Sequence, residues 1–261
     1  MWDLAADHPV LPVILARITL APTPVLALFL LAAVPFPGRA QDPGPSGESI
    51  RLPDPTLDGP VSVESAIQAR RSVRDFAEEP LALAALSQLL WAGQGVTEPM
   101  EDAPPGFRWP WAGGLRAAPS AGALYPLEVY AVVGGVEGLD PGLYRYLPSR
   151  HALEPLAEGD PREDVWGAAL RQSAIRSAPV TLVIAGVVAR TAAKYGDRAE
   201  RYVHMEVGAA SENVWLQAQA LGLGAVFIGA FRDEEVRRIL DLPEDHHVYG
   251  IMPLGRPAGG S

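Results

Sequence analysis

The chain of 261 residues contains no cysteine. This absence excludes disulfides, a thiolate nucleophile, iron–sulfur clusters and cysteine zinc sites, so a redox function needs a borrowed cofactor. Histidine is also scarce: there are five, with no HExxH pair and no other metal-ligand spacing. His246 and His247 follow a proline and two acidic residues, which favours an exposed loop. The sequence therefore predicts no metal site.

Positive charge is the other shortage, because the formal net charge is -10. An acidic balance argues against a broad nucleic-acid surface, and the basic clusters are too local to follow a phosphate backbone. The motifs GxxxxGK[ST] and GxSxG and the kinase set are also missing. The segment 222–227 lacks the third glycine of a dinucleotide fingerprint and runs from helix to strand, the reverse of that motif. Hydrolase, kinase and Rossmann readings therefore have no support.

The N-terminal region has one long uncharged run, residues 18–38, which follows Arg17. A short apolar core after a basic residue and before small residues indicates a signal peptide, with cleavage after Ala40. An uncleaved membrane anchor is the alternative, although four prolines make the run a poor spanning helix. Asp3 and Asp7 are unusual ahead of such a run, so a true start nearer Arg17 is also open. The sequence predicts an exported, periplasmic or extracytoplasmic protein, or a membrane-anchored one.

The rest of the chain divides by composition. Residues 41–60 are rich in Pro, Gly, Ser and Asp and predict a linker, residues 61–257 a folded domain, and residues 258–261 a tail. Apolar periodicity predicts helices over 62–70, 80–93, 165–173, 202–221 and 233–240, and strands over 127–133, 142–146, 152–156, 180–187, 225–229 and 248–254. This order, without regular βαβ alternation, indicates an α+β fold. The tryptophan pair of the long loop 95–118, Trp109 and Trp111, is either a substrate lid or part of the core.

A basic cluster opens the folded domain, formed by Arg70, Arg71, Ser72 and Arg74. Guanidinium groups match phosphate geometry, and a helical turn would direct Arg70 and Arg74 the same way. The alternative is a solvated helix end whose arginines pair with the acidic residues Glu64, Asp75, Glu78 and Glu79. Further on, the small residues of 118–126 allow a backbone to approach a flat ligand closely. With a glycine after a late strand, these features suggest a flat phosphorylated cofactor.

Five motifs in register carry a family resemblance. They are residues 70–76, 118–126, 194–196 with 202–206, 218–224 with 228–231, and 253–257. In this order they resemble the FMN-dependent nitroreductases and, within that family, the SagB/thiazole-oxidase-type dehydrogenases. The resemblance spans about residues 61–257. It implies a nitroreductase-like α+β fold with a central, mainly antiparallel sheet flanked by helices, and a homodimer with flavin at the interface.

The resemblance also assigns roles to residues. The FMN phosphate would be held by Arg70, Arg71, Ser72 and Arg74, with Arg256 as a further contact, and the flavin would be reached from the partner subunit by Pro119, Ser120, Ala121 and Gly122. After Ile228, the backbone N–H groups of Gly229 and Ala230 would approach flavin N5 and a nearby carbonyl, which tunes hydride acceptance. Lys194 and Tyr195 match the acid/base pair of the thiazole-oxidase branch, although an exposed lysine beside a half-buried tyrosine is the plain alternative.

The implied activity is ping-pong hydride transfer from NAD(P)H or another donor to a nitro, quinone or azoline-like substrate. Branch members mature peptides with a cyclodehydratase partner, so the substrate is a small molecule or a peptide. An export signal fits azole formation poorly, and the Lys194–Tyr195 match then indicates ancestry more than that reaction. Two alternatives remain: an exported, non-catalytic flavin-binding or scaffold protein of the same fold, and an anion-binding module without flavin.

Overall fold

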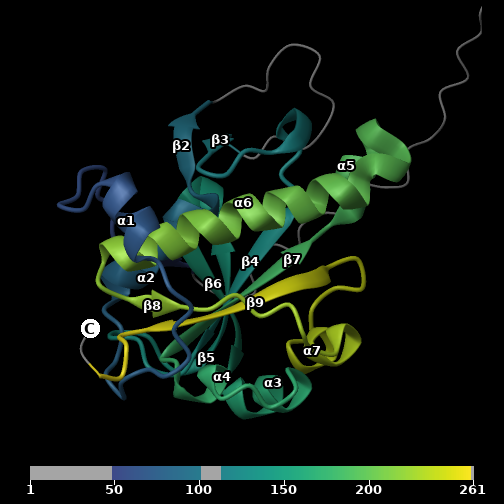
Figure 1. Cartoon of the computed structure of the whole chain (residues 1–261). Helices are drawn as coiled ribbons and strands as arrows, with labels where there is room; N and C mark the ends of the chain where they lie inside the picture. The colour runs from purple at the N-terminus through teal and green to yellow at the C-terminus, as the bar shows by residue number, and fades with distance from the viewer. Residues whose placement is uncertain (1–48, 101–112, 260–261) are drawn as a thin grey trace, which may run out of the picture. The chain divides into compact units, whose positions relative to one another are not determined.

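A seven-stranded antiparallel sheet forms the centre of the folded unit (Figure 1). The computed structural model describes residues 49–100 and 113–259, which belong to the unit Pro43–Ser261. The strands are β1 (Ile50–Arg51), β4 (Leu127–Val133), β5 (Gly142–Leu147), β6 (Ala152–Glu158), β7 (Val180–Gly186), β8 (Gly224–Ala225) and β9 (His247–Gly255), in the order β1-β6-β5-β4-β7-β9-β8. The predicted α+β class with a mainly antiparallel central sheet is confirmed.

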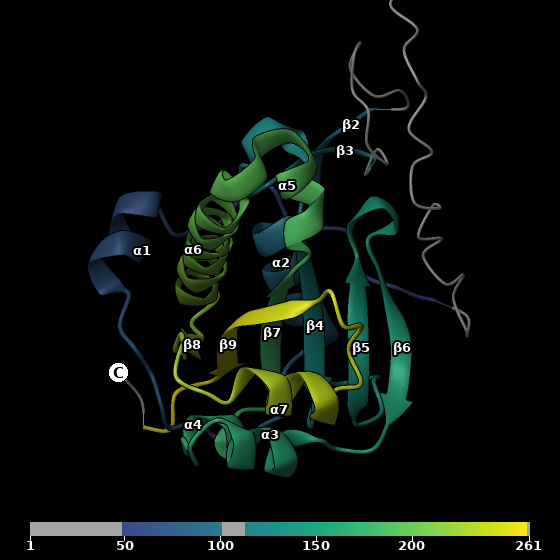
Figure 2. The same ribbon diagram turned by 90° about the vertical axis from the view of Figure 1, so that its right-hand side faces the viewer.

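Helices cover both faces of this sheet (Figure 2). They are α1 (Val63–Ala69), α2 (Leu83–Gln94), α3 (Arg162–Ala168), α4 (Ala174–Ser177), α5 (Val188–Tyr195), α6 (Ala199–Ala220) and α7 (Asp233–Ile239). Helices α2, α5 and α6 lie on one face, and α3, α4 and α7 lie on the other. In the part of the chain that the structure describes, no helix is long and apolar enough to cross a membrane.

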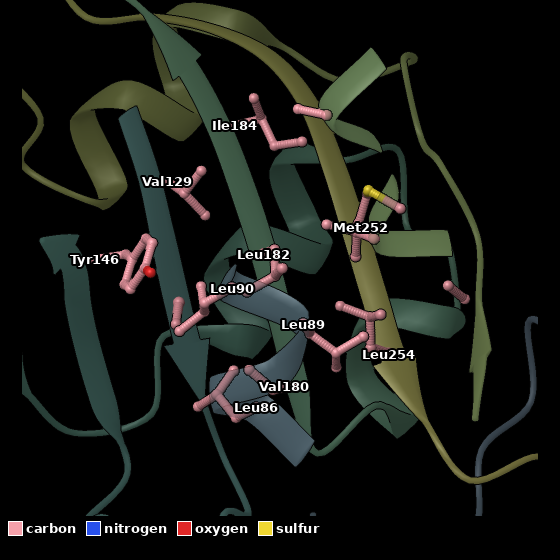
Figure 3. Packing of buried hydrophobic residues seen from close by; sticks show 14 of the residues in the cluster. Leu86, Leu89, Leu90, Val129, Tyr146, Val180, Leu182, Ile184, Met252 and Leu254 are labelled. Carbon is pink, nitrogen blue, oxygen red and sulfur yellow. The ribbon is translucent and has the colours of Figure 1, made fainter. Parts of the chain in front are cut away.

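The central strands alternate between two hydrophobic cores. In β7, Leu182 and Ile184 point toward α2 and α6, whereas Val183 and Ala185 point toward α3 and α7. Figure 3 shows the first core, where three leucines of α2 meet β7 and β9; the labelled residues include Leu86, Leu89, Leu90, Leu182, Ile184, Met252 and Leu254. Burying each such side chain contributes about 1.5–3 kcal/mol, so β7, which is buried along its whole length, contributes strongly to the stability of the fold.

Several element boundaries differ from the sequence prediction. The helix predicted over 165–173 is α3, which begins at Arg162 and already ends at Ala168, and the separate helix α4 follows the predicted end. The strand predicted over 225–229 shortens to β8 followed by an isolated bridge between Ile228 and Ile251. Residues 95–118 include a short hairpin of β2 (Val96–Pro99) and β3 (Gly114–Arg116). Local sequence cannot reveal this hairpin, because its two strands pair across a long connection. Trp109 and Trp111 lie outside the described residues.

The folded domain begins earlier than the predicted boundary near Val61. Ile50 and Arg51 pair with Leu153 and Ala152 of β6, and Leu52 is only 2% exposed. Prolines and glycines on both sides of this short strand hide it from a composition reading. The predicted signal peptide or anchor, residues 1–40, lies outside the described residues.

The apolar face of α1 is largely uncovered. Ala66 is buried, but Val63 and Ile67 are 64% and 57% exposed. Helix α1 is only two turns long and sits outside the layer formed by α2 and α6 (Figure 2). Two large apolar side chains are therefore left uncovered within the described chain, which is typical of a contact surface.

His246 corrects the prediction of an exposed histidine pair. It is 6% exposed, and its Nδ1 shares a 2.5 Å hydrogen bond with the hydroxyl of Tyr130 on β4. His247 is exposed, as predicted. Burial lowers the pKa of His246, which keeps the ring neutral against the second core.

Because His246 is buried, we predict that the protein loses stability in acid. As the pH falls below the ordinary histidine pKa of 6.5, the unfolded chain binds a proton that the native protein resists. We expect His246 to lower the free energy of unfolding by up to about 1.4 kcal/mol per pH unit in this window, levelling off below its lowered pKa. Urea unfolding of wild type and His246→Gln at several pH values measures the difference. The exposed His247→Gln is the control and keeps the wild-type pH dependence; an equal slope in His246→Gln contradicts the prediction.

Candidate functional site

The arginine segment is extended rather than helical. Helix α1 starts behind Ser62, whose Oγ accepts a hydrogen bond from the N–H of Ser65, and it ends at Ala69. Ser72 then forms a parallel bridge with Ala225, and the N–H of Val73 donates to the Ala225 carbonyl at 2.9 Å. The predicted helical i, i+4 arrangement of the arginines is therefore wrong, because the segment pairs with β8 instead.

The three arginines of this segment have different surroundings. The guanidinium of Arg70 lies 4.4 Å from the ring centroid of Trp215 on α6. Arg71 Nη1 donates to the carbonyls of Gln68 and Arg70 at 2.9 and 2.7 Å, which closes the end of α1. Arg74 is exposed. None of the three forms an ion pair among the described residues, so the predicted alternative of pairing with nearby acids does not hold there.

Arg256 reaches the same region from the end of β9. Its carbonyl accepts a hydrogen bond from Ala77 at 2.8 Å, and its Nε lies 3.1 Å from Oε2 of Glu79. The structure therefore places Arg256 alongside the segment that follows Arg74. We call Arg70, Arg71, Ser72, Arg74 and Arg256 the arginine cluster; only Arg256 of this group has an acidic partner in the described chain.

The small-residue loop before β4 runs along α6. The Ala117 carbonyl accepts a hydrogen bond from Asn213 Nδ2 at 3.2 Å, and the Ala121 N–H donates to Glu206 Oε1 at 2.9 Å. At the next residue, a Cβ built on Gly122 would lie 2.8 Å from Lys194 Nζ and 2.9 Å from the Tyr195 hydroxyl. The structure thus brings the loop and the predicted Lys194–Tyr195 pair into contact.

This loop has an unusual backbone. Gly122, Ala123 and Tyr125 have φ angles of 64°, 55° and 46°, in the left-handed region that non-glycine residues avoid. Such residues cost about 1–3 kcal/mol each and persist only where the surroundings hold them. The Tyr125 N–H donates to Ser120 Oγ at 2.9 Å, and the Arg116 guanidinium lies 4.5 Å from the Tyr125 ring centroid. A strained loop held by several contacts is typical of a binding or catalytic site.

The charged groups beneath the loop have altered acidity. Burial lowers the pKa of Arg116 to about 10, and it raises the pKa of Glu206. Hydrogen bonds to Glu206 from the Ala121 N–H and from Ser120, together with the charge of Arg116, oppose the effect of burial on that carboxyl.

Gly229 and Ala230 offer backbone donors beyond β8. Ile228 is buried and exchanges backbone hydrogen bonds with Ile251 at 2.8 and 3.0 Å. These bonds hold the backbone in place just before Gly229. Gly229 and Ala230 are exposed, and their N–H groups have no partner among the residues that the structure describes. The Ala230 carbonyl accepts from Gln172 Nε2 at 3.1 Å. Two free donors on an anchored turn suit a ligand with acceptor atoms.

Helix α6 connects the arginine cluster and the loop but keeps them apart. Glu206 contacts the loop, and Trp215 contacts Arg70 and also donates from Nε1 to the Arg71 carbonyl. Glu206 and Trp215 are nine positions apart, which is roughly 14 Å along the helix axis. Helix α5 lies at the start of α6 and α1 lies beside its other end (Figure 1).

A groove of about 700 Å³ borders α1. Its walls come from residues 56–63, α2 and α6, and they combine alanines and leucines with the polar side chains of Gln88, Asn213 and Gln217. The exposed Val63 of α1 lies on its rim. Elsewhere in the described ranges, no three His, Asp or Glu side chains gather as metal ligands.

The fold is a three-layer α+β arrangement. Its candidate site combines the arginine cluster and the strained small-residue loop, both of which contact the long helix α6. The family model described as the nitroreductase family matches residues 67–256. The chain belongs to this family of oxidoreductases.

Individual relatives support the assignment to this family. A protein of Methanocaldococcus jannaschii named as a nitroreductase is 40% identical over 210 residues, which cover 80% of this chain and 98% of that protein. The microcin B17-processing protein McbC of Escherichia coli is 30% identical over 134 residues, 49% of each chain. A solved structure from Ralstonia eutropha, also described as a nitroreductase, has a TM-score of 0.65 at 28% identity and covers 82% of this chain and 94% of that one.

Three residues at the site escaped the sequence prediction: Glu206, Arg116 and Trp215. Glu206 left one usable signal, because a carboxylate stands on the apolar stripe of α6 between Val203 and Ala210. Trp215 left none, because its partners Arg70 and Arg71 lie far away in the chain. Arg116 left none, because its contact with Tyr125 depends on the shape of the loop between them.

The absence of a side chain at Gly122 leads to a testable prediction. A methyl group there would displace Lys194 Nζ, and the positive φ would add about 1–2 kcal/mol of strain. We expect Gly122→Ala to change the acylation rate of Lys194, the only lysine of the chain, by about twofold or more, because the exposed amine loses its place against the loop.

Gly138→Ala is the matched control, because Gly138 has φ 78° with open space around it. It carries the same backbone strain but leaves the Lys194 rate unchanged. Peptide mass spectrometry after a short acylation pulse measures both variants. Equal Lys194 rates in Gly122→Ala and wild type contradict the described contact.

Proposed function

We propose that this protein is an FMN-dependent oxidoreductase that transfers hydride between NAD(P)H or another donor and a small organic substrate by a ping-pong mechanism. The observation that carries the proposal is the arginine cluster, in which Arg70, Arg71 and Arg74 have no acidic partner among the described residues. An acidic protein that keeps three such cations together provides a site for a phosphate group.

The residues present fit FMN. The arginine cluster would hold the phosphate, and the free N–H groups of Gly229 and Ala230 would face acceptor atoms of the ring. Ser72 and Ala225 belong to one bridge, and the chain runs from Ala225 to Gly229, so phosphate donors and ring donors lie along one continuous edge. When bound, FMN supplies hydride chemistry that none of the side chains of this cysteine-free protein offers.

Lys194 and Tyr195 would handle protons at the substrate. Lys194 Nζ lies 5.3 Å from the Tyr195 ring centroid, and the Tyr195 ring packs edge-on against Tyr202 at 5.0 Å. Lys194 is exposed and Tyr195 is half-buried, so the amine faces solvent while the ring is held. An ammonium and a phenol can each donate a proton to a substrate atom, and the neutral amine or the phenolate can accept one, as reduction or oxidation proceeds.

We propose that the protein acts as a homodimer with the flavin at the subunit interface. The arginine cluster and the loop at Pro119 to Gly122 occupy different parts of α6, so a second subunit can bring its loop to the flavin held by the first. The exposed Val63 and Ile67 and the neighbouring groove give the apolar surface that such a contact requires.

The finer assignment is the SagB/thiazole-oxidase-type branch, with a nitro, quinone or azoline-like compound or a peptide as substrate. The Lys194–Tyr195 pair and the similarity to McbC over 49% of its length support it. We also propose export, by signal peptide or anchor, on the uncharged run 18–38. The rival function is a flavin-binding scaffold without turnover.

Flavin binding is expected to depend on the arginines. Each charge-assisted contact to phosphate contributes about 1.5–3 kcal/mol, so Arg70→Ala and Arg74→Ala should each weaken FMN binding about tenfold or more. Arg74→Ala is the cleaner variant, because Arg70 also stacks on Trp215. Fluorescence titration of purified protein with FMN measures the affinities, and sedimentation of the same samples should show a dimer.

Exposed Arg150, on the turn between β5 and β6, gives the control variant Arg150→Ala with unchanged affinity. A wild-type protein that gains no flavin spectrum with FMN refutes the cofactor assignment and leaves the anion-binding module. Equal weakening by Arg150→Ala refutes the role of the cluster.

Turnover separates the enzyme from the scaffold. Mixing the FMN-loaded protein with NADH or NADPH in a stopped-flow instrument should bleach the flavin absorbance, and an added quinone or nitro compound should restore it. Lys194→Ala and Tyr195→Phe should slow the substrate step by about 100-fold, as loss of a general acid does, with FMN affinity within about twofold of wild type. Bound flavin that no donor reduces would support the scaffold instead.

A further inference from the structure

Glu206 is a charged residue on the buried, apolar side of helix α6. It is 6% exposed and stands on the apolar stripe of α6, between Val203 and Ala210. Carboxylates are almost never buried to this degree unless they are paired or hydrogen-bonded. Its position therefore requires an interaction strong enough to offset the loss of water.

That interaction is with the strained loop. Oε1 of Glu206 accepts the N–H of Ala121 at 2.9 Å, one residue before the positive-φ Gly122. The carboxylate thus engages the loop where its backbone enters the left-handed turn. Ala121 is 85 positions away in sequence, so this contact ties two distant parts of the chain together.

The same turn positions the Lys194–Tyr195 pair. Because Gly122 has no side chain, Lys194 Nζ and the Tyr195 hydroxyl both approach its α-carbon, at 2.8 and 2.9 Å from the point that a Cβ would occupy. Helix α5, which carries the pair, packs on α6, which carries Glu206. A movement of the loop at Ala121 therefore changes the space in which the amine and the phenol sit.

We propose that Glu206 is a positioning residue, a buried carboxylate that clamps the loop through Ala121 so that Gly122 fixes Lys194 and Tyr195 for reaction. The role rests on the proposed function in assigning a reaction to that pair. The clamp itself is a property of the chain and does not need the flavin.

Hydrogen exchange of the flavin-free protein tests the clamp directly. Loss of a charge-assisted hydrogen bond should speed exchange of the peptide covering 118–126 about tenfold or more in Glu206→Ala. Glu206→Gln retains an acceptor oxygen of the same shape and should rescue most of the protection, leaving exchange about two- to fivefold faster. The acylation rate of Lys194 should change by about twofold or more in Glu206→Ala and return toward the wild-type rate in Glu206→Gln.

Glu212→Ala is the matched control, since Glu212 is an exposed carboxylate on the same helix. It should change neither exchange of the loop nor the Lys194 rate. Wild-type exchange in Glu206→Ala, or equal changes in Glu212→Ala, overturn the proposal. Should Glu206→Ala fail to fold, Glu206→Gln decides, because wild-type exchange and wild-type Lys194 reactivity in that variant leave no role for the charge.

Kinetics of the FMN-loaded protein distinguish positioning from general support of the fold. At saturating FMN, a positioning role lowers kcat for the substrate step about tenfold or more in Glu206→Ala, with KM within about twofold, and Glu206→Gln recovers most of kcat. A kcat within about twofold of wild type in FMN-saturated Glu206→Ala overturns the positioning role. Failure of FMN to bind wild type refutes the proposed function alone, because exchange and acylation report on the clamp without flavin.

Discussion

Burial of the central strands on both faces is the constraint on which the rest of this structure depends. Strands β4, β7 and β9 contribute alternate side chains to two cores, so helices must cover both sides. The groups of the proposed site lie around the periphery of the sheet. Ser72 joins the edge strand β8 from outside, and Ala121 and Gly122 lie in the turn that leads into the central strand β4.

Helix α6 contacts both of these regions. Its apolar stripe packs on the sheet, while its flanks hold the arginine segment through Trp215 and the small-residue loop through Asn213 and Glu206. A straight 22-residue helix keeps a fixed spacing between the two groups. One rigid helix therefore sets the distance between the proposed phosphate site and the proposed proton-transfer pair.

The physical organisation suits a protein that borrows its reactive group. Nothing in the cysteine-free chain can carry electrons alone, and membership of the nitroreductase family makes it an oxidoreductase. The chain contributes fixed cations, free backbone N–H groups and a strained loop, all of which act by position and charge. Strain at Ala123 and Tyr125 is tolerated because Glu206, Ser120 and Arg116 hold the turn from three sides.

The sequence alone determined the family, the α+β class and most element positions, because the apolar periodicity of β7 and α6 and the order of five motifs are local properties. It also located the arginines, the loop and the Lys194–Tyr195 pair as separate pieces. Only the tertiary structure decided how they meet. The Arg70–Arg74 segment became extended by pairing with β8, His246 became buried against Tyr130, and Glu206 turned from a helix residue into the partner of Ala121. Each of these depends on contacts between distant residues, whose energies no local pattern contains.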